Sequence, residues 1–185
     1  MDIVLASGSP RRKELLGTLG LEFSVVPAND EEIAPEGAGP AETVMVLSRA
    51  KAAEVAKSYP ESLVIAADTV VWAEDRILGK PKSEAEAKAM LHMLSDNTHE
   101  VYTGVTLMLG DKEVVGAECT KVFFRRLTDA EIDRYVATGE PMDKAGAYGI
   151  QGKGRLLVRG IEGDFYTVMG LPISRLYREL RALKA

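Results

Sequence analysis

The chain has 185 residues, of which 46% are hydrophobic, and this length and composition are typical of a globular protein with a sizeable core. Its formal net charge of −5 gives no general electrostatic reason to bind nucleic acid or an anionic membrane. A single cysteine, Cys119, excludes an internal disulfide framework and a cysteine-based zinc site, and without a signal-like or membrane-spanning pattern we expect a cytoplasmic protein.

Hydrophobic periodicity predicts alternating strands and helices along the whole chain. Helix starts are indicated by Ser9 before a proline and by capping-box patterns at Ser83 and Thr128. The expected elements are, in chain order, a strand at 3–6, a helix from 10, a strand at 23–26, a helix from about 40 to 58, a strand at 63–67, a helix to about 94, strands at 101–109 and 113–124, a helix at 132–137, a strand near 156–161 and a helix from about 172. Gly110 and Asp111 predict a hairpin, which we expect to build a second lobe. We therefore predict a mixed α/β fold in one domain, residues 1–185, with two lobes.

The segment LASGSPRRKELL, residues 5–16, places Arg11 and Arg12 at the start of a helix. Cations there cost about 0.3 to 1 kcal/mol each, because a helix N-terminus carries partial positive charge. A small-residue turn between a strand and a helix also has the geometry of an anion site, which a polyphosphate would complete. The alternative is that both arginines simply face solvent. The pattern is neither a Walker A loop nor a dinucleotide-binding glycine motif.

Two lysines are further candidates for phosphate binding. Lys51 lies on the same helical stripe as Val44, Leu47 and Val55, so it either extends out to solvent or meets an anion. Lys80, in the sequence LGKP, precedes a proline that favours extended backbone, although a lone loop lysine is often only solvated.

Asp68 interrupts the apolar segment LVIAADTVVW, which is typical of a buried strand. A carboxylate in such a setting requires a cation, a metal ion or a proton. The alternative, an aspartate capping the end of the strand, is less favoured because Val70 continues the apolar pattern. Together with Glu32 from the acidic loop at 27–39, Asp68 has the chemistry to hold Mg²⁺, which accepts one or two carboxylates plus substrate phosphates.

Six motifs, in this order, resemble the Maf family: LASGSPRRKELL, RAKA, AADTVV, LGKP, TGEPMDKAGAYGIQGKG and GDFYTVMGLP. The resemblance covers residues 5–172. It implies an elongated mixed-sheet α/β fold like that of the inosine triphosphate pyrophosphatases, with two lobes around a central cleft. It also implies hydrolysis of a nucleoside triphosphate to its monophosphate and pyrophosphate, with a divalent metal cation, Mg²⁺ or Mn²⁺.

The resemblance also implies roles for individual residues. The positions matching phosphate-binding residues are Ser7, Arg12, Lys51 and Lys80; those matching metal-binding residues are Glu32 and Asp68, with Asp68 also the catalytic proton acceptor. Arg11, Thr69 and Gln151 match the specificity positions of a subgroup similar to dTTP/UTP pyrophosphatases, whereas a sibling subgroup acting on 7-methyl-GTP differs there. The glutamine amide matches the O4 acceptor and N3–H donor of uracil or thymine. The loop before Glu32 reads PANDEE, whereas the commoner family sequence is DIDE. The match of Glu32 to the family's metal-binding position therefore depends on how the two loops are aligned.

Two functions follow as hypotheses. The first is a dTTP/UTP pyrophosphatase that binds a nucleoside triphosphate, with no nucleic acid or membrane partner; a homodimer is left open. The second is a nucleotide-binding regulator of septum formation or cell division with little turnover, since the family takes its name from septum formation. The intact set of basic and acidic residues favours the enzyme, and a pyrophosphate-release assay distinguishes the two.

Overall fold

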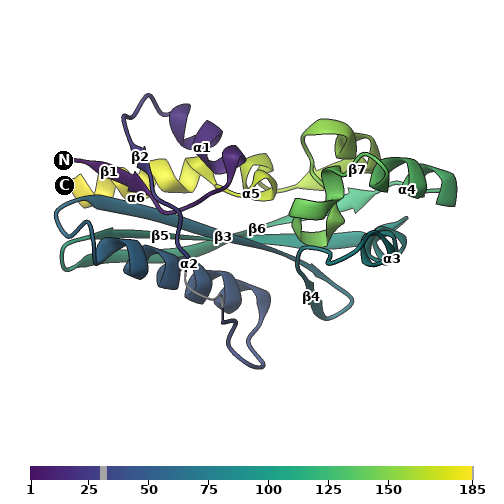
Figure 1. Cartoon of the computed structure of the whole chain (residues 1–185), viewed down its shortest axis with the longest axis horizontal. Coiled ribbons are helices and arrows are strands. Elements are labelled where there is room, and N and C mark those ends of the chain that lie inside the picture. The colour runs from purple at the N-terminus through teal and green to yellow at the C-terminus, as the bar shows by residue number, and fades with distance from the viewer. Residues whose placement is uncertain (30–32, 185) are drawn as a thin grey trace. The chain divides into compact units, whose positions relative to one another are not determined.

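The computed structural model describes residues 1–29 and 33–184 (Figure 1). The elements are β1 (Ile3–Leu5), α1 (Pro10–Gly17), β2 (Ser24–Val25), α2 (Pro40–Ala56), β3 (Leu63–Ala73), β4 (Arg76–Leu78), α3 (Glu84–Leu94), β5 (Thr98–Leu109), β6 (Lys112–Phe124), α4 (Asp129–Val136), the short 3-10 helices η1 (Glu140–Asp143), η2 (Ala145–Ala147) and η3 (Gly152–Leu157), then β7 (Val158–Glu162), α5 (Phe165–Met169) and α6 (Ile173–Lys184). The predicted order of strands and helices is confirmed, with β4, α5 and the 3-10 helices as additions. Most element ends differ from the prediction by a few residues, as is usual for such boundaries. The exception is β3, which continues six residues beyond the predicted 63–67 and ends at Ala73.

The strands form one mixed sheet, which confirms the predicted fold class. Among the described residues, the sheet order is β2-β1-β3-β5-β6-β7, with β4 paired to β3. β1 pairs in parallel with both of its neighbours, so Val4 lies opposite Ser24 on one side and Val64 on the other. The pairs β3–β4 and β6–β7 are antiparallel. The sheet is not closed, because β2 and β7 are its two ends.

Helix starts follow the sequence signals in different degrees. Thr128 and Glu131 form the full capping box expected at α4. At α3, the Ser83 hydroxyl accepts a hydrogen bond from the Glu86 N–H, while the Glu86 carboxylate accepts from the N–H of Lys82. At α1, Ser9 occupies the N-cap position but its side chain makes no capping hydrogen bond. The start of α1 therefore differs chemically from the other two.

The chain divides into two compact units. Unit 1 comprises residues 1–69, 103–118 and 170–185, and unit 2 comprises residues 70–102 and 119–169. The expectation that the hairpin builds a second lobe is therefore wrong for residues 103–118, which belong to unit 1. The reason is strand length: β5 and β6 have 12 and 13 residues. A strand of this length extends for about 40 Å, so its two halves pack into different cores.

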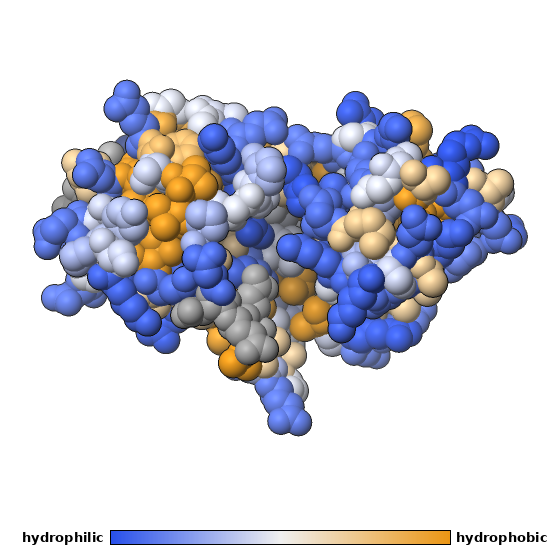
Figure 2. Space-filling model, viewed as in Figure 1, coloured by the Kyte–Doolittle hydropathy of each residue, from blue (hydrophilic) through white to orange (hydrophobic). Residues whose placement is uncertain are grey.

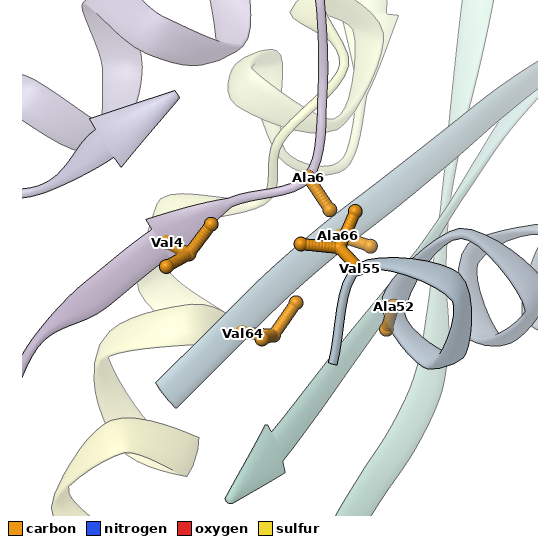
Figure 3. Close-up of a cluster of buried hydrophobic side chains, with 6 residues drawn as sticks. All are labelled: Val4, Ala6, Ala52, Val55, Val64 and Ala66. Atoms are coloured by element: carbon orange, nitrogen blue, oxygen red, sulfur yellow. The ribbon is translucent and has the colours of Figure 1, made fainter. Parts of the chain in front are cut away.

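In unit 1, α2 packs on β1 and β3 through small side chains (Figure 3). The buried cluster consists of Val4, Ala6, Ala52, Val55, Val64 and Ala66. Residues 4 and 6 of one strand and 64 and 66 of the next share a face, because side chains alternate along a strand. Three alanines in this cluster keep the helix close to the sheet.

Two further contacts fix α2 against β5. A Cβ atom on Gly104 would lie 2.3 Å from the Val44 carbonyl oxygen, so the backbones of the helix and the strand meet directly. One turn further along the helix, the Ser48 hydroxyl lies 2.9 Å from that of Thr106, and both residues are fully buried. Because these two points set the rotation of α2, they also set the direction of the next inward position, residue 51.

Helix α6 is amphipathic. In α6, Leu176 and Leu180 are buried four residues apart, while Tyr177 and Arg178 are exposed. Polar residues cover most of the face shown in Figure 2. No helix in residues 1–29 and 33–184 is long and apolar enough to cross a membrane.

Unit 2 contains a buried aromatic cluster of His99, Phe124 and Tyr148. The rings pack edge to face with centroids 4.7–5.3 Å apart. His99 Nε2 lies 2.7 Å from the Tyr148 hydroxyl, and within the described part of the chain His99 Nδ1 has no hydrogen-bond partner. Burial lowers the pKa of His99 to about 4, so the ring is neutral at pH 7.

Acid is expected to destabilise the fold through His99. Between pH 6.5 and 4, the unfolded chain protonates this histidine and the folded chain does not, so the free energy of unfolding falls by up to about 3 kcal/mol. His99→Gln should flatten the decline in urea-unfolding free energy over this range. His92→Gln, at an exposed histidine, is the matched control and should leave the decline in place. Equal slopes in the two variants would contradict the assignment.

Candidate functional site

The turn after β1 holds Ser7, which is buried although it is polar. Its hydroxyl accepts hydrogen bonds from the Ser9 N–H, at 3.2 Å, and from Arg12 Nη1, at 3.3 Å. The first turn of α1 has no acidic residue and no side-chain cap. Peptide N–H groups at a helix start favour anions, so this turn combines a hydroxyl, a cation and the positive end of a helix.

The guanidinium of Arg12 is held in place by three oxygen atoms of unit 1. Besides Ser7, it donates from Nε to the Gly170 carbonyl at 2.8 Å and from Nη2 to the Thr69 hydroxyl at 3.1 Å. The Thr69 hydroxyl in turn lies 2.8 Å from the hydroxyl of Thr103 on β5. A planar guanidinium oriented in this way is suited to bind a phosphate, because its donors point in fixed directions.

Asp68 lies in the middle of β3 and forms an ion pair with Lys51 of α2. Lys51 Nζ donates to Asp68 Oδ1 at 2.5 Å, and the two side chains are only 15% and 9% exposed. The ammonium supplies the countercharge that a buried carboxylate requires. The alternative of an aspartate capping the strand end is wrong, since β3 continues to Ala73. Lys51 meets an anion rather than extending to solvent, and that anion is a side chain of the same unit.

The alternation of side chains along β3 explains why two groups of residues meet at this strand. Asp68 shares the face of Val64 and Ala66, which is the face covered by α2, and this directs it toward Lys51. The next residue, Thr69, points to the opposite face and reaches Arg12. Two consecutive residues of β3 therefore join an ion pair on one face to a positioned arginine on the other.

Three further predicted residues, Arg11, Lys80 and Gln151, belong to the described part of the chain. Arg11 is partly buried at the start of α1. Lys80 is exposed in the loop between β4 and α3, and Gln151 is partly buried directly before η3; both belong to unit 2. Glu32 falls in residues 30–32, outside the described residues.

Asp68 is the described residue that the sequence assigned to a metal ion, and its carboxylate is paired with Lys51. Among residues 1–29 and 33–184, no group of three or more histidine, cysteine, aspartate or glutamate side chains is arranged to hold a metal. A cation such as Mg²⁺ accepts as few as one or two protein carboxylates, because substrate phosphates and water complete its ligand set.

Two residues that are hydrogen-bonded to Arg12 or Thr69 were not predicted from the sequence: Thr103 and Gly170. Thr103 is fully buried, and its position in the alternating segment VYTGVTLML was a usable signal, since a polar residue on an inward face needs a partner. Gly170 has φ of +110°, and a Cβ there would lie 3.4 Å from Thr69 Oγ1 and 3.5 Å from Arg12 Nε. The close approach of its carbonyl to Arg12 was not readable from the sequence.

Comparison with known proteins identifies the family of this chain and solved structures with a similar fold. The Maf-like protein family matches residues 2–183. A dTTP/UTP pyrophosphatase from Bacillus cytotoxicus is 56% identical over 178 residues, covering 96% of this chain and 93% of the relative. A dTTP/UTP pyrophosphatase from Bacillus cereus is 55% identical over 179 residues, covering 97% and 94%. A solved structure of a HAM1 protein from Coxiella burnetii has a TM-score of 0.55 at 18% identity, covering 98% of this chain and 99% of that chain, so this likeness is one of fold.

Proposed function

Because the chain belongs to the Maf family, we propose that it is a nucleoside triphosphate pyrophosphatase that hydrolyses dTTP and UTP to the monophosphate and pyrophosphate. The observation that carries the proposal is the pair of consecutive residues Asp68 and Thr69 on β3. Asp68 brings a buried, ion-paired carboxylate, and Thr69 brings the positioned guanidinium of Arg12. A base and an oriented anion-binding group are both parts that hydrolysis of a phosphoanhydride uses.

In the proposed reaction, water attacks the α-phosphorus and Asp68 accepts its proton. Lys51 holds the carboxylate in its buried position and balances its charge before substrate arrives. Arg12, Ser7 and the amides at the start of α1 bind phosphate oxygens, and Lys80 is proposed as a further phosphate-binding residue. As pyrophosphate leaves, these groups stabilise the negative charge that gathers on its oxygens. The negative charge of the substrate phosphates would then offset the unfavourable position of the arginines at the N-terminus of α1.

We propose that Asp68 and Glu32 bind a divalent cation, Mg²⁺ or Mn²⁺, together with substrate phosphates. When bound, the cation supplies neutralisation of phosphate charge and polarisation of water. The support is the hard oxygen chemistry of the Asp68 carboxylate, which suits such a cation.

Arg11, Thr69 and Gln151 are proposed to select the base. The amide of Gln151 offers both a donor and an acceptor, which match O4 and N3–H of uracil and thymine. Thr69 acts partly through Arg12, because its hydroxyl is bonded to that guanidinium. The relatives named dTTP/UTP pyrophosphatase, at 55–56% identity, support this choice of base.

Gln151→Glu is expected to lower kcat/KM for UTP by roughly ten- to two-hundred-fold, because a second acceptor would face the O4 acceptor of the base. Guanine presents N1–H and N2–H donors, so GTP should be penalised less. The ratio of kcat/KM for UTP to that for GTP, measured in both proteins, is the readout. An unchanged ratio would mean that Gln151 does not recognise the base and has only a structural role in its turn.

The proposed function is tested by measuring pyrophosphate release from a panel of nucleoside triphosphates with Mg²⁺ or Mn²⁺. Rapid release from UTP and dTTP, with one pyrophosphate per monophosphate formed, supports the enzyme. Tight nucleotide binding without turnover would favour the alternative of a regulator of cell division. We further propose that units 1 and 2 act as one domain, residues 1–185, in the cytoplasm, without nucleic acid or membrane partners; a homodimer can be tested by sedimentation.

A further inference from the structure

Glu140, at the start of η1, binds the glycine-rich segment 149–154 through its side chain. Its carboxylate accepts hydrogen bonds from the N–H of Lys153 and the N–H of Gly154, both at 3.0 Å. It also accepts one from the hydroxyl of Tyr135, at 2.9 Å. Two backbone amides and a buried tyrosine thus converge on one carboxylate, although Glu140 itself lies near the surface of unit 2.

Tyr135 extends this contact to the other end of the same segment. Its hydroxyl accepts a hydrogen bond from the Gly149 N–H at 3.1 Å while it donates to Glu140. The segment closes on itself, since a Cβ on Gly154 would lie 2.1 Å from the Gly149 carbonyl oxygen. The two residues therefore hold both ends of a short loop, and Gln151 lies inside it.

Charge and geometry both favour an ionised Glu140. Burial alone would raise the pKa of this carboxyl, but hydrogen bonds from the amides of Lys153 and Gly154 outweigh it and lower the pKa. Lys144 adds a nearby positive charge and donates to the Glu140 carbonyl at 2.9 Å. Gly152 has φ of +70°, and a Cβ there would lie 2.7 Å from Glu140 Oε2, so the carboxylate lies directly against the loop backbone.

Gln151 depends on this backbone for its orientation. Within residues 1–29 and 33–184, its side-chain amide makes no hydrogen bond to the protein, so no side-chain partner fixes the direction of its donor and acceptor. We propose that Glu140, together with Tyr135, positions the loop so that the Gln151 amide can discriminate the base. This inference rests on the proposed function, in which Gln151 reads uracil or thymine. Glu140 and Tyr135 are then positioning residues that act through Gln151.

Glu140→Gln tests the inference because the amide keeps the size of the side chain but has a single acceptor oxygen, so its NH₂ would face a backbone N–H. We expect a drop of about tenfold in the ratio of kcat/KM for UTP to that for GTP, through a higher KM for UTP and little change in kcat. Tyr135→Phe, which keeps the buried ring, should move the ratio in the same direction by a smaller factor.

Glu131→Gln is the matched control. Glu131 is also a carboxylate of unit 2 that accepts from a backbone N–H and a hydroxyl, those of Thr128, and it pairs with Arg125. Its loss should affect α4 and leave base discrimination unchanged. If Glu131→Gln shifts the ratio as much as Glu140→Gln does, general loosening of unit 2 explains the effect and the inference is overturned.

A double-mutant cycle separates this inference from the proposed function. If Gln151→Ala lowers the ratio and Glu140→Gln adds nothing further to it, Glu140 acts through Gln151. If the two effects add, or if Gln151→Ala lowers the ratio while the single variant Glu140→Gln leaves it unchanged, the positioning role is overturned while base reading stands. If Gln151→Ala leaves the ratio unchanged, base reading by Gln151 fails and the role of Glu140 fails with it. Amide hydrogen exchange gives an independent readout: Lys153 and Gly154 should exchange faster in Glu140→Gln, and unchanged exchange overturns the inference.

Discussion

Asp68→Asn is expected to lower kcat for pyrophosphate release by roughly 10²- to 10⁴-fold, which is the usual effect of removing a general base. The amide has the size of the carboxylate and can still accept a hydrogen bond from Lys51, so the chain should still fold and keep much of its nucleotide binding. Its free energy of unfolding should fall, because the Lys51 ammonium loses its paired carboxylate. It cannot accept the proton of the attacking water at neutral pH, and it is a weaker ligand for a hard cation. Single-turnover pyrophosphate release measures the loss directly.

The control for this variant is Asp111→Asn, the same chemical change at an exposed position in the turn between β5 and β6. Its kcat should match that of the unmodified protein. Nucleotide affinity, measured by calorimetry, should be similar in the two variants. Near-normal turnover in purified Asp68→Asn protein would remove Asp68 from the proposed chemistry.

Lys51→Met is expected to lower the free energy of unfolding by about 3 kcal/mol, because it removes a close countercharge of the buried Asp68 carboxylate. Lys51 and Asp68 are only 15% and 9% exposed, so water screens the remaining charge poorly. For a chain of this size, the loss corresponds to a fall in Tm of roughly 6 to 12 °C. Urea unfolding at pH 7, without nucleotide or metal ion, gives the value.

The double variant Lys51→Met with Asp68→Asn should be more stable than Lys51→Met alone, since no buried charge is then left without a countercharge. Additive losses would mean that the two side chains contribute independently. The experiment also separates the stabilising role of Lys51 from any contact with substrate phosphate, because no nucleotide is present.

Much of the fold and part of the site were predictable, because they follow from local pattern. The apolar run around Asp68 predicted a buried strand, and the helical stripe through Lys51 predicted an inward-facing lysine. Both predictions are confirmed. That these two residues pair with each other was not predictable, because periodicity tells which face a side chain occupies and not which residue lies opposite.

Contacts between distant segments set the limit of sequence reasoning. Arg12 and Gly170 are separated by 158 positions, and no local signal connects them. The extent of the two units was also missed, because the length of β5 and β6 places the turn of the hairpin in unit 1 and its other ends in unit 2. The glycines of the segment 149–154 predicted a turn. The contact of Glu140 with this segment was not predictable, because the carboxylate binds two backbone N–H groups, which every residue except proline has.

The bond between Arg12 and the Gly170 carbonyl has a consequence for how the protein is made. A nascent chain ending at residue 169 already contains every residue proposed to bind or cleave the substrate, yet it lacks this acceptor and the rest of the third segment of unit 1. Segments fold as they leave the ribosome, from the N-terminus onward. Arg12 therefore cannot form this bond until residue 170 has been synthesised, and a chain that lacks residues 170–185 should not hydrolyse nucleotides at the full rate.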